Sequence, residues 1–543
     1  MGAKELMFII LIVNVFWLSS SLSEEGKALM LFKNGLDKES HKLLSSWNES
    51  SQFPCKWTGI TCDKFQKVSA IDLASLNLEG SLNSSVSSLH SLKRIDLSHN
   101  RLTGSIPPSF LNLKNLEELV LENNYLSGRI PPELGQMRSL RLLSLGVNNL
   151  QGEIPAELIG MKELAFLNLT VNYLSGGIPA QLGNLTKLQV LRLGLNNLTG
   201  PIPMELGRLH KLQILELFEN PLGGRIPEGI FVLRNLTVLY LDNNLLSGNI
   251  SQSLGKYSDI SRVSFSSNSL TGNLPPQICQ RGRLQLLSVN RNNFSGGIPM
   301  SIRNCNSLLR LWLDRNQLEG SITNALGEYP SLTYLDISFN HLHGEIPPVL
   351  GQCHNLIVLV MSGNNLTGTI PLEITGLKKL AVLNISSNHI RGSIPPEIGN
   401  ISTLFRINMS NNELTGTIPV QIGKLTALRT LALSRNNLYG EIPSEIGHLQ
   451  RLRELRLDGN NFTGSIPARV GNLVNLQRNL DLSYNSLSGT IPAQLSNLES
   501  LKILNLSHNN LTGRIPSSFQ DLRSLDTLDL SYNHLEGPLW RCA

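Results

Sequence analysis

One 24-residue pattern recurs along most of the chain and constrains its fold more than any other feature. An asparagine, here called the marker asparagine, stands at Asn100 and then at 24-residue intervals up to Asn460. One extra residue enters near residues 477–480, after which the interval resumes at Asn485. Four positions after each marker stands a glycine. A fixed period of this length is typical of solenoids, in which successive coils stack on one another.

The shape of one coil can be predicted from a single copy of the pattern. Ile95 and Leu97 alternate with polar residues, and a period of two predicts a short strand with one buried and one solvated face. Asn100 follows where the chain turns inward, and a buried carboxamide is tolerated only when its donors and acceptor are satisfied. We therefore expect the marker asparagines to bond to the backbone of neighbouring coils. The glycine suits a sharp bend, and the proline of Ile106-Pro107 starts an extended segment.

Length and charge agree with a stacked architecture. An ordinary globular chain of 543 residues would divide into several domains, whereas the core of a solenoid grows in one dimension. We predict an α/β solenoid, a superhelix of about 20 coils over residues 67–537 with a parallel concave β-sheet and an N-terminal helical cap. The net charge of +5 is spread without a basic run. This disfavours a nucleic-acid ligand and leaves weak attraction to acidic polysaccharide open.

The first 23 residues have the features of a secretory signal peptide. Lys4 precedes an apolar run from Leu6 to Leu18, and small residues follow. The alternative is an anchoring membrane helix, but this run is interrupted by Asn14 and is shorter than the ~20 residues needed to span a bilayer. We expect cleavage.

Residues 24–66 are predicted to cap the first coil. Glu24–Leu36 has its apolar residues at helical spacing. Cys55 and Cys62 lie close together in a secreted context, so a disulfide is the expected state. Zinc is the alternative, and it lacks two further ligands nearby.

The other four cysteines are harder to assign. Cys305 and Cys353 occupy the same repeat position two coils apart, which is too far for a disulfide. Cys279 and Cys305 lie on neighbouring coils, where a bridge is feasible, but we favour buried free thiols. Cys542 lies in the tail, residues 538–543, beyond the last coil and is expected to be unpaired.

The consensus L-x-x-L-x-L-x-x-N-x-L-x-G-x-I-P resembles the plant-specific leucine-rich repeat, whose distinguishing Ile-Pro pair is present at Ile106-Pro107 and Ile130-Pro131. The cap sequence from Phe53 to Cys62 is similar to the N-terminal domain of plant leucine-rich repeat receptor-like kinases. The last coils resemble the subgroup of these kinases that perceives secreted peptides.

This resemblance implies an ectodomain that binds a peptide on its concave face and then recruits a shorter leucine-rich repeat co-receptor kinase. In the family, a proline, a cysteine pair, a membrane span and a kinase domain follow the repeats. Here Trp540 stands in the place of that proline, and no apolar run of membrane-spanning length or kinase signature occurs. We therefore expect a truncated receptor, either a secreted form or a product of an incomplete gene model.

A ligand site is expected where the concave positions, those four, two and one residues before each marker, are neither small nor simply polar. Exposed aromatic residues beside charges are typical of binding hot spots. The central coils carry such residues at or beside these positions: Glu216, Phe218, Glu219, Tyr240, Asp242, Arg291, Trp312, Asp314, Arg315, Tyr334, Asp336 and Phe339.

Glycosylation motifs sharpen this choice. The predicted acceptors are Asn48, Asn83, Asn168, Asn184, Asn197, Asn235, Asn249, Asn293, Asn365, Asn384, Asn400, Asn408, Asn461, Asn505 and Asn510. Four of them, Asn168, Asn384, Asn408 and Asn505, occupy concave positions, where a glycan would obstruct a ligand. From Arg192 to Val360 no concave position carries a motif, and this window coincides with the aromatic cluster.

A second candidate patch contains Arg429, Arg435, Arg453 and Arg456, with acidic residues nearby. Arginine side chains suit carboxylates, so this patch is predicted to hold the acidic end of a peptide or to touch a co-receptor. A solvated charged face is an equally plain interpretation.

Two further classes of function compete with peptide recognition. A secreted inhibitor of wall-degrading enzymes, similar to polygalacturonase inhibitors, uses a related but shorter solenoid. An enzyme is disfavoured because no nucleophile elbow, phosphate-binding loop or metal cluster occurs, and no cofactor is expected. The expected location is the outer face of the plasma membrane for a receptor fragment, or otherwise the apoplast and cell wall.

Overall fold

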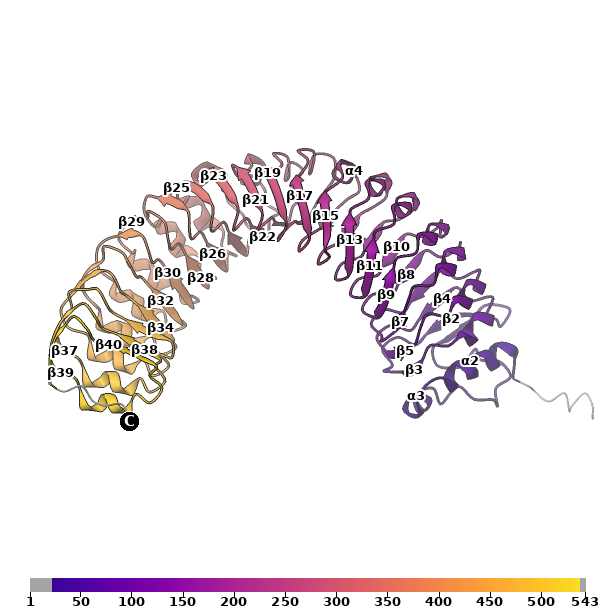
Figure 1. Ribbon diagram of the computed structural model, residues 1–543, viewed down its shortest axis with the longest axis horizontal. Coiled ribbons are helices and arrows are strands. Elements are labelled where there is room, and N and C mark those ends of the chain that lie inside the picture. The colour runs from indigo at the N-terminus through magenta and orange to yellow at the C-terminus, as the bar shows by residue number, and fades with distance from the viewer. Residues whose placement is uncertain (1–21, 538–543) are drawn as a thin grey trace, which may run out of the picture. The chain divides into compact units, whose positions relative to one another are not determined.

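The structure, a computed structural model, describes residues 22–537. The chain forms two compact units, residues 1–248 and 249–543, called here the N-terminal and C-terminal units (Figure 1). The predicted signal peptide thus falls almost wholly outside the described residues, as do Trp540 and Cys542. In each unit, successive coils stack side by side.

The N-terminal cap consists of α2 (Glu24–Asn34) and α3 (Lys38–Leu43), followed by β1 (Ile60–Cys62). The predicted first helix ends at Asn34 rather than Leu36, because Gly35 caps it and Leu36 bridges to the first coil instead. Trp47 is 1% exposed and stacks on Trp57 with ring centroids 5.6 Å apart. The expected Cys55–Cys62 disulfide is confirmed.

Every coil of each unit contributes one short strand to a sheet whose exposed side chains form the concave face. These concave strands run parallel to their neighbours within a unit, and β1 pairs antiparallel with the first of them. In the N-terminal unit they are β2 (Val68–Asp72), β4 (Arg94–Asp96), β6 (Glu118–Val120), β8 (Leu142–Ser144), β10 (Phe166–Asn168), β12 (Val190–Arg192), β14 (Ile214–Glu216) and β16 (Val238–Tyr240). In the C-terminal unit they are β18 (Arg262–Ser264), β20 (Leu286–Ser288), β22 (Arg310–Trp312), β24 (Tyr334–Asp336), β26 (Val358–Val360), β28 (Val382–Asn384), β30 (Arg406–Asn408), β32 (Thr430–Ala432), β34 (Glu454–Arg456), β36 (Asn479–Asp481), β38 (Ile503–Asn505) and β40 (Thr527–Asp529).

A second short strand follows each marker position and pairs with the equivalent strand of the next coil over parts of each unit. These second strands are β3 (Glu79–Ser81), β5 (Arg101–Thr103), β7 (Ser127–Gly128), β9 (Asn149–Glu153), β11 (Tyr173–Gly177), β13 (Asn197–Pro201), β15 (Leu222–Arg225) and β17 (Leu245–Asn249), then β19 (Ser269–Asn273), β21 (Asn293–Gly296), β23 (Gln317–Ser321), β25 (His341–Glu345), β27 (Asn365–Thr367), β29 (Arg391–Gly392), β31 (Glu413–Leu414), β33 (Tyr439–Glu441), β35 (Asn461–Thr463), β37 (Ser488–Thr490), β39 (Asn510–Arg514) and β41 (His534–Glu536).

A helical turn completes most coils, and in most it starts directly after the proline of the Ile-Pro pair because that proline ends the extended segment with its φ near −65°. The 3₁₀ turns are η1 (Ser84–Ser88), η2 (Pro108–Asn112), η3 (Pro132–Gln136), η4 (Ala156–Gly160), η5 (Ala180–Asn184), η6 (Met204–Arg208), η7 (Pro348–Gln352), η8 (Leu372–Gly376), η9 (Pro396–Asn400), η10 (Val420–Lys424), η11 (Ser444–His448), η12 (Ala468–Asn472), η13 (Ala493–Asn497) and η14 (Ser517–Asp521). Short α-helical turns replace them at α4 (Glu228–Phe231), α5 (Met300–Arg303) and α6 (Ile322–Ala325).

The marker asparagines form the hydrogen-bonded ladder that the sequence predicts. In one coil, Asn316 is 4% exposed and its Nδ2 donates to the carbonyls of Val289 and Leu313 at 3.0 and 3.2 Å. Its Oδ1 accepts from the backbone N–H of Phe294 at 3.0 Å. The same three contacts recur at Asn340, so each asparagine ties its own coil to the preceding one.

The expectation of three free internal thiols is wrong for two of them. Cys279 and Cys305 form a disulfide with their Cα atoms 5.9 Å apart. Cys279 lies within the turn of one coil and Cys305 follows α5 of the next, so the two side chains meet between coils despite their offset in the repeat. Cys353 is free and buried, as predicted, and accepts a hydrogen bond from the N–H of Tyr329.

Candidate functional site

The predicted ligand residues divide between the two units, and each group is described on its own unit. Glu216, Phe218, Glu219, Tyr240 and Asp242 belong to the N-terminal unit. The C-terminal unit holds the larger group, called here the aromatic cluster: Arg291, Trp312, Asp314, Arg315, Tyr334, Asp336 and Phe339.

The aromatic cluster is built on the adjacent parallel strands β22 and β24. Their register places Trp312 opposite Asp336, and the rings of Trp312 and Tyr334 meet edge to face with centroids 5.2 Å apart. The guanidinium of Arg310 lies 5.6 Å from the Trp312 ring centroid. Both aromatic side chains are half-buried at strand positions whose alternating partners fill the core. The two rings therefore form a preorganised apolar surface that remains open to a ligand.

A second aromatic–cation pair lies at the margin of this surface. Arg315 stands 4.7 Å from the ring centroid of Phe339, which is 50% exposed. Each directly precedes a marker asparagine, and both adopt left-handed backbone conformations with φ of 55° and 53°. This conformation is uncommon for residues other than glycine. It recurs here because the chain must turn out of the strand before the marker asparagine turns inward.

Two carboxyl groups face the aromatic surface. Burial, together with the neighbouring Asp336 carboxylate, raises the pKa of Asp314 to about 6. Burial also raises the pKa of Asp336, although its carboxylate accepts hydrogen bonds from the Ser338 N–H and Oγ at 3.0 and 2.6 Å. Neither carboxylate forms an ion pair within residues 22–537. The pair can accept hydrogen bonds from N–H groups or an ammonium of a bound peptide.

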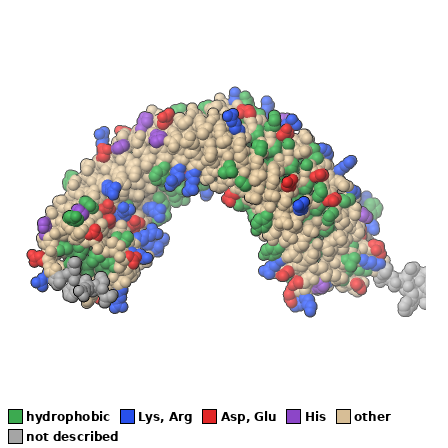
Figure 2. Space-filling view, in the orientation of Figure 1, with side chains coloured by type: hydrophobic (Ala, Val, Ile, Leu, Met, Phe, Trp, Pro, Cys, Tyr) green, Lys and Arg blue, Asp and Glu red, His purple; other side chains and the backbone are tan. Residues whose placement is uncertain are grey.

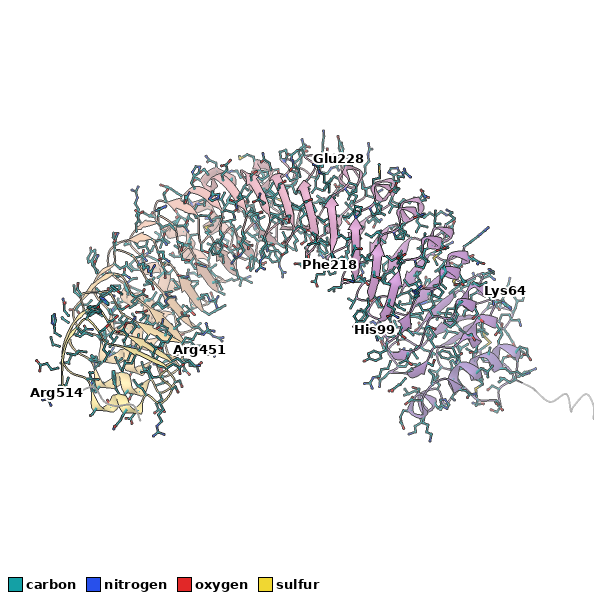
Figure 3. All side chains as sticks on the ribbon, viewed as in Figure 1. Lys64, His99, Phe218, Glu228, Arg451 and Arg514 are labelled. Atoms are coloured by element: carbon teal, nitrogen blue, oxygen red, sulfur yellow. A yellow bond between two sulfur atoms is a disulfide. The ribbon has the colours of Figure 1, made fainter. Side chains whose placement is uncertain are left out.

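The N-terminal unit presents a smaller group of predicted residues. Glu216 pairs with Arg192 at 3.1 Å, and burial raises the pKa of Glu216 while Arg192 partly opposes this rise. Figure 3 shows Phe218 on the concave side and Glu228 on the outer side. Phe218 packs over Gly194, where a Cβ would lie only 2.6 Å from the ring. Much of this group is therefore satisfied by contacts within the unit.

The four arginines of the predicted patch differ in their immediate surroundings. Arg456 lies 3.9 Å from Asp458, and Arg435 has a left-handed backbone on the rim beside Gly459. Arg429 and Arg453 instead line a shallow cavity of about 170 Å³ together with Arg451 and Asn475.

The concave glycosylation motifs are poorly placed to carry glycans. Asn168 is 4% exposed, and its Nδ2 donates to Glu122 and Ser144. Asn384, Asn408 and Asn505 are half-buried, and each Oδ1 accepts from the backbone N–H two residues on. The window without glycosylation motifs therefore supports the predicted ligand site less than the sequence indicates. Most of the remaining motif asparagines are exposed. Glycosylation at all fifteen positions stays a prediction.

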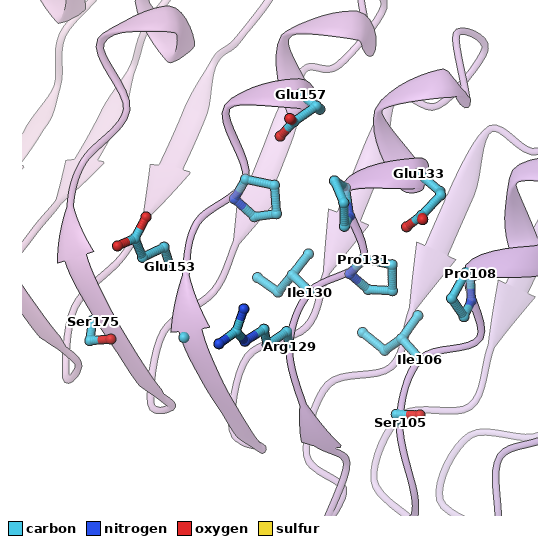
Figure 4. Close-up of a pocket in the computed structure, with 13 residues that line it drawn as sticks. Ser105, Ile106, Pro108, Arg129, Ile130, Pro131, Glu133, Glu153, Glu157 and Ser175 are labelled. Atoms are coloured by element: carbon cyan, nitrogen blue, oxygen red, sulfur yellow. The ribbon is translucent and has the colours of Figure 1, made fainter.

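The N-terminal unit also has an outer cavity of about 690 Å³ that the sequence does not predict (Figure 4). It lies among the Ile-Pro segments, with Arg129, Glu133, Glu153 and Glu157 at its margin. Because its apolar part is built from the repeated Ile-Pro pairs, we interpret it as a groove of the repeat itself.

Sequence reasoning missed Arg192, Arg310 and Arg451 as members of these sites. Arg192 stands four residues before Asn196, a concave position that the search already covered. Arg310 stands six residues before Asn316, so a search extended to that position would have included it. Arg451 lies outside the strand, so only the structure places it beside Arg429 and Arg453.

Comparison with known proteins agrees with this architecture. Residues 22–63 match the leucine-rich repeat N-terminal domain, and residues 349–468 and 406–537 match a leucine-rich repeat region. The solved ectodomain of the Arabidopsis receptor kinase HAESA with an IDA peptide hormone is 34% identical, with a TM-score of 0.81, over 95% of this chain and 94% of that one. The complex of HAESA with IDA and the co-receptor SERK1 gives 34% identity and a TM-score of 0.78 over 95% of both chains. The Arabidopsis thaliana GASSHO1/SCHENGEN3 ectodomain with CASPARIAN STRIP INTEGRITY FACTOR 2 is 33% identical, with a TM-score of 0.75, over 94% of this chain and 73% of that one.

The fold and these matches define a plant-type leucine-rich repeat solenoid. The chain belongs to the leucine-rich repeat ectodomains of plant receptor kinases. One match to a curated full-length kinase is 40% identical over 89 residues. That stretch is 16% of this chain and 8% of a leucine-rich repeat receptor-like serine/threonine-protein kinase from Arabidopsis thaliana.

Across residues 22–537, no helix has both the length and the hydropathy required to cross a bilayer. The same residues contain no group of three or more His, Cys, Asp or Glu side chains arranged to hold a metal ion.

Proposed function

We propose that this chain is the extracellular ligand-recognition module of a receptor and that it binds a secreted peptide across the aromatic cluster of the C-terminal unit. The observation that carries the proposal is the half-exposed Trp312–Tyr334 pair on the concave strands, with two unpaired carboxylates beside it. The solved relatives with peptide hormones support the same class of ligand. Their similarity to this chain makes a non-catalytic role the one proposed for it.

The chemistry of the cluster suggests how a peptide is held. The two rings offer an edge-to-face apolar surface, on which a proline or aliphatic side chain can pack. Asp314 and Asp336 then accept from peptide N–H groups or a basic side chain, and Arg315 is available to a carboxylate. A shorter leucine-rich repeat co-receptor kinase is the proposed second partner, by analogy with the HAESA complex that contains SERK1. The proposed location is the outer face of the plasma membrane or the apoplast.

The experiment is selection from a random peptide library against the glycosylated secreted chain, followed by calorimetry. A selected peptide should bind at micromolar or better affinity. A Trp312→Ala/Tyr334→Ala variant should bind the same peptide at least about tenfold more weakly, because the truncation removes the packing surface. Tyr439→Ala, an exposed aromatic on β33, is the matched control. Unchanged affinity in the double variant would move the site elsewhere. Failure to select any peptide, combined with inhibition of a polygalacturonase, would support the wall-enzyme inhibitor instead.

A further inference from the structure

A row of positive side chains runs along the N-terminal ends of the last concave strands. One cation stands seven residues before each of four successive markers, and all four side chains are exposed. This set, called here the cation row, comprises Arg429, Arg453, Arg478 and Lys502. The extra residue near position 477 shifts the numbering by one and leaves the row intact. Figure 2 shows Lys and Arg side chains along this margin, where Figure 3 labels Arg451.

Backbone hydrogen bonds keep the row in register. The N–H of Arg453 donates to the carbonyl of Arg429 at 2.8 Å, and the N–H of Arg478 donates to the carbonyl of Arg453 at 2.9 Å. Adjacent members therefore stand on neighbouring rungs of the same sheet. Neighbouring strands lie about 4.8 Å apart, so the row offers one cation at each interval of this length.

The row is only weakly neutralised by the protein. Within residues 22–537, Arg429, Arg451 and Arg453 form no ion pair. These three side chains line a shallow cavity together with Asn475. Arg478 and Lys502 have acidic partners, Glu454 and Asp526, but only at 4.0 Å and with the cations largely exposed. Exposed ion pairs of this kind add little to protein stability, so the two cations can readily exchange their acidic protein partners for a bound anion.

The same repeat position in the N-terminal unit behaves differently. There Lys93, Glu117 and Arg141 alternate in sign, and Glu117 pairs with both cations at 3.5 and 3.7 Å. The next coils carry Ala165 and Gln189. The repeat therefore does not require a cation at this position, and the cation row is particular to the last coils.

The spacing of the row selects among anionic ligands. In an extended peptide, side chains on one side repeat every ~6.6 Å, which does not match a rung spacing of about 4.8 Å. A linear chain of uronic acids carries one carboxylate on every sugar ring, and rotation about its glycosidic linkages lets successive carboxylates turn toward long cationic side chains. Arginine also provides forked donors for carboxylates. We infer that the cation row binds a linear polyuronate, an acidic polysaccharide with free carboxylates on successive sugars.

Predicted glycans do not cover this row. Among the coils with markers from Asn436 to Asn533, the motif asparagines are Asn461 and Asn510 on second strands and Asn505 on a concave strand. None lies on the segments between the helical turns and the concave strands, where the row stands. The polymer would therefore reach the row on the glycosylated protein, and this site is separate from the proposed peptide site.

The test uses the full secreted chain and de-esterified oligogalacturonides as the probe. Binding should be measurable by biolayer interferometry at low salt, weaken as salt rises, and be lost with the methyl-esterified form of the same oligosaccharide. Arg453→Gln/Arg478→Gln should weaken it by roughly tenfold, since two charge-assisted contacts are removed. The matched control is Lys93→Gln/Arg141→Gln at the equivalent position of the N-terminal unit.

Three results would overturn the inference. The first is equal binding of the esterified and de-esterified probes, and the second is an equal loss of oligogalacturonide affinity in the two double variants. The third is tighter binding of a poly-aspartate of the same charge, which would indicate an acidic protein partner. All substituted residues are exposed, so unchanged melting temperatures are expected and confirm that the variants fold. Peptide binding by the same variants, measured separately, shows whether the polyuronate site and the proposed peptide site fail independently.

Discussion

The buried asparagine ladder and the aromatic cluster lie on the same coils of the C-terminal unit, yet they differ in what fixes their residues. Asn316 makes three backbone hydrogen bonds that recur at Asn340 in the next coil. Trp312, four residues earlier, meets Tyr334 edge to face, a contact that no other described coil repeats. Inward positions are held constant by stacking, because every coil must satisfy the same neighbours. Outward positions have no such constraint, so they can carry recognition.

The largest effect is expected where the ladder is broken. Asn316→Ala leaves the buried Phe294 N–H without its acceptor and removes one donor each from the carbonyls of Val289 and Leu313, which keep the Nδ2 donors of Asn292 and Asn340. The orphaned N–H and the lost hydrogen bonds together should cost about 3–5 kcal/mol. Urea unfolding of the C-terminal unit, followed by limited proteolysis, measures this loss. Glu319→Ala, an exposed substitution in the same coil, should change stability by less than about 0.5 kcal/mol. Similar costs for the two variants would mean that the ladder does not hold the coils together.

A smaller loss is expected from the inter-coil disulfide. Cys279→Ala/Cys305→Ala releases a bridge across 26 residues and should destabilise the C-terminal unit by about 3 kcal/mol. Peptide affinity should be unchanged in the folded variant, because the bridge does not contribute to the concave face. Cys55→Ala/Cys62→Ala should affect the cap instead, so protease cleavage sites in the two variants should differ. Identical cleavage patterns would contradict local stabilisation by the two bridges.

The smallest stability effect should come from the cluster, and it should depend on pH. The folded pKa of Asp314, about 6, lies above its ordinary value of 3.8, so folding favours the protonated form. Asp314 therefore contributes stability to the free energy of unfolding below about pH 4, and this contribution is lost as the pH rises through 6. Asp314→Asn should therefore be about 1–2 kcal/mol more stable than the wild type at pH 7.5 and no more stable at pH 4. Thermal melts across this range measure the difference, and a pH-independent gap would contradict burial of the carboxyl.

The same comparison explains what could be predicted from the sequence. The strand and the marker hydrogen bonds follow from residues that stacking forces to repeat, as at Asn100. The cap disulfide follows instead from the closeness of Cys55 and Cys62 in the sequence. The Cys279–Cys305 bridge was missed because it joins two different repeat positions. Its formation depends on the local geometry around α5, which a one-dimensional period does not specify.

The candidate site was predictable only in part. Strand alternation correctly placed Trp312 and Tyr334 on the solvated face, since parity alone decides that. It could not reveal the Trp312–Tyr334 contact or the approach of Asp314 to Asp336, which depend on rotamers and on register between strands. Burial of Asn168 was missed for the same reason, because its neighbours Glu122 and Ser144 lie on other coils.

The most direct test of the central claim is to map where a bound peptide lies. A peptide selected against the secreted chain would carry a photoreactive residue and be cross-linked, and the product would be digested and sequenced by mass spectrometry. Adducts are expected on strands β22 and β24, at Trp312, Tyr334 or their immediate neighbours, and they should be lost in the presence of excess unlabelled peptide. Competable adducts confined to the helical turns, such as η7 of the same unit, would contradict this claim, because repeated outer positions would then carry the recognition.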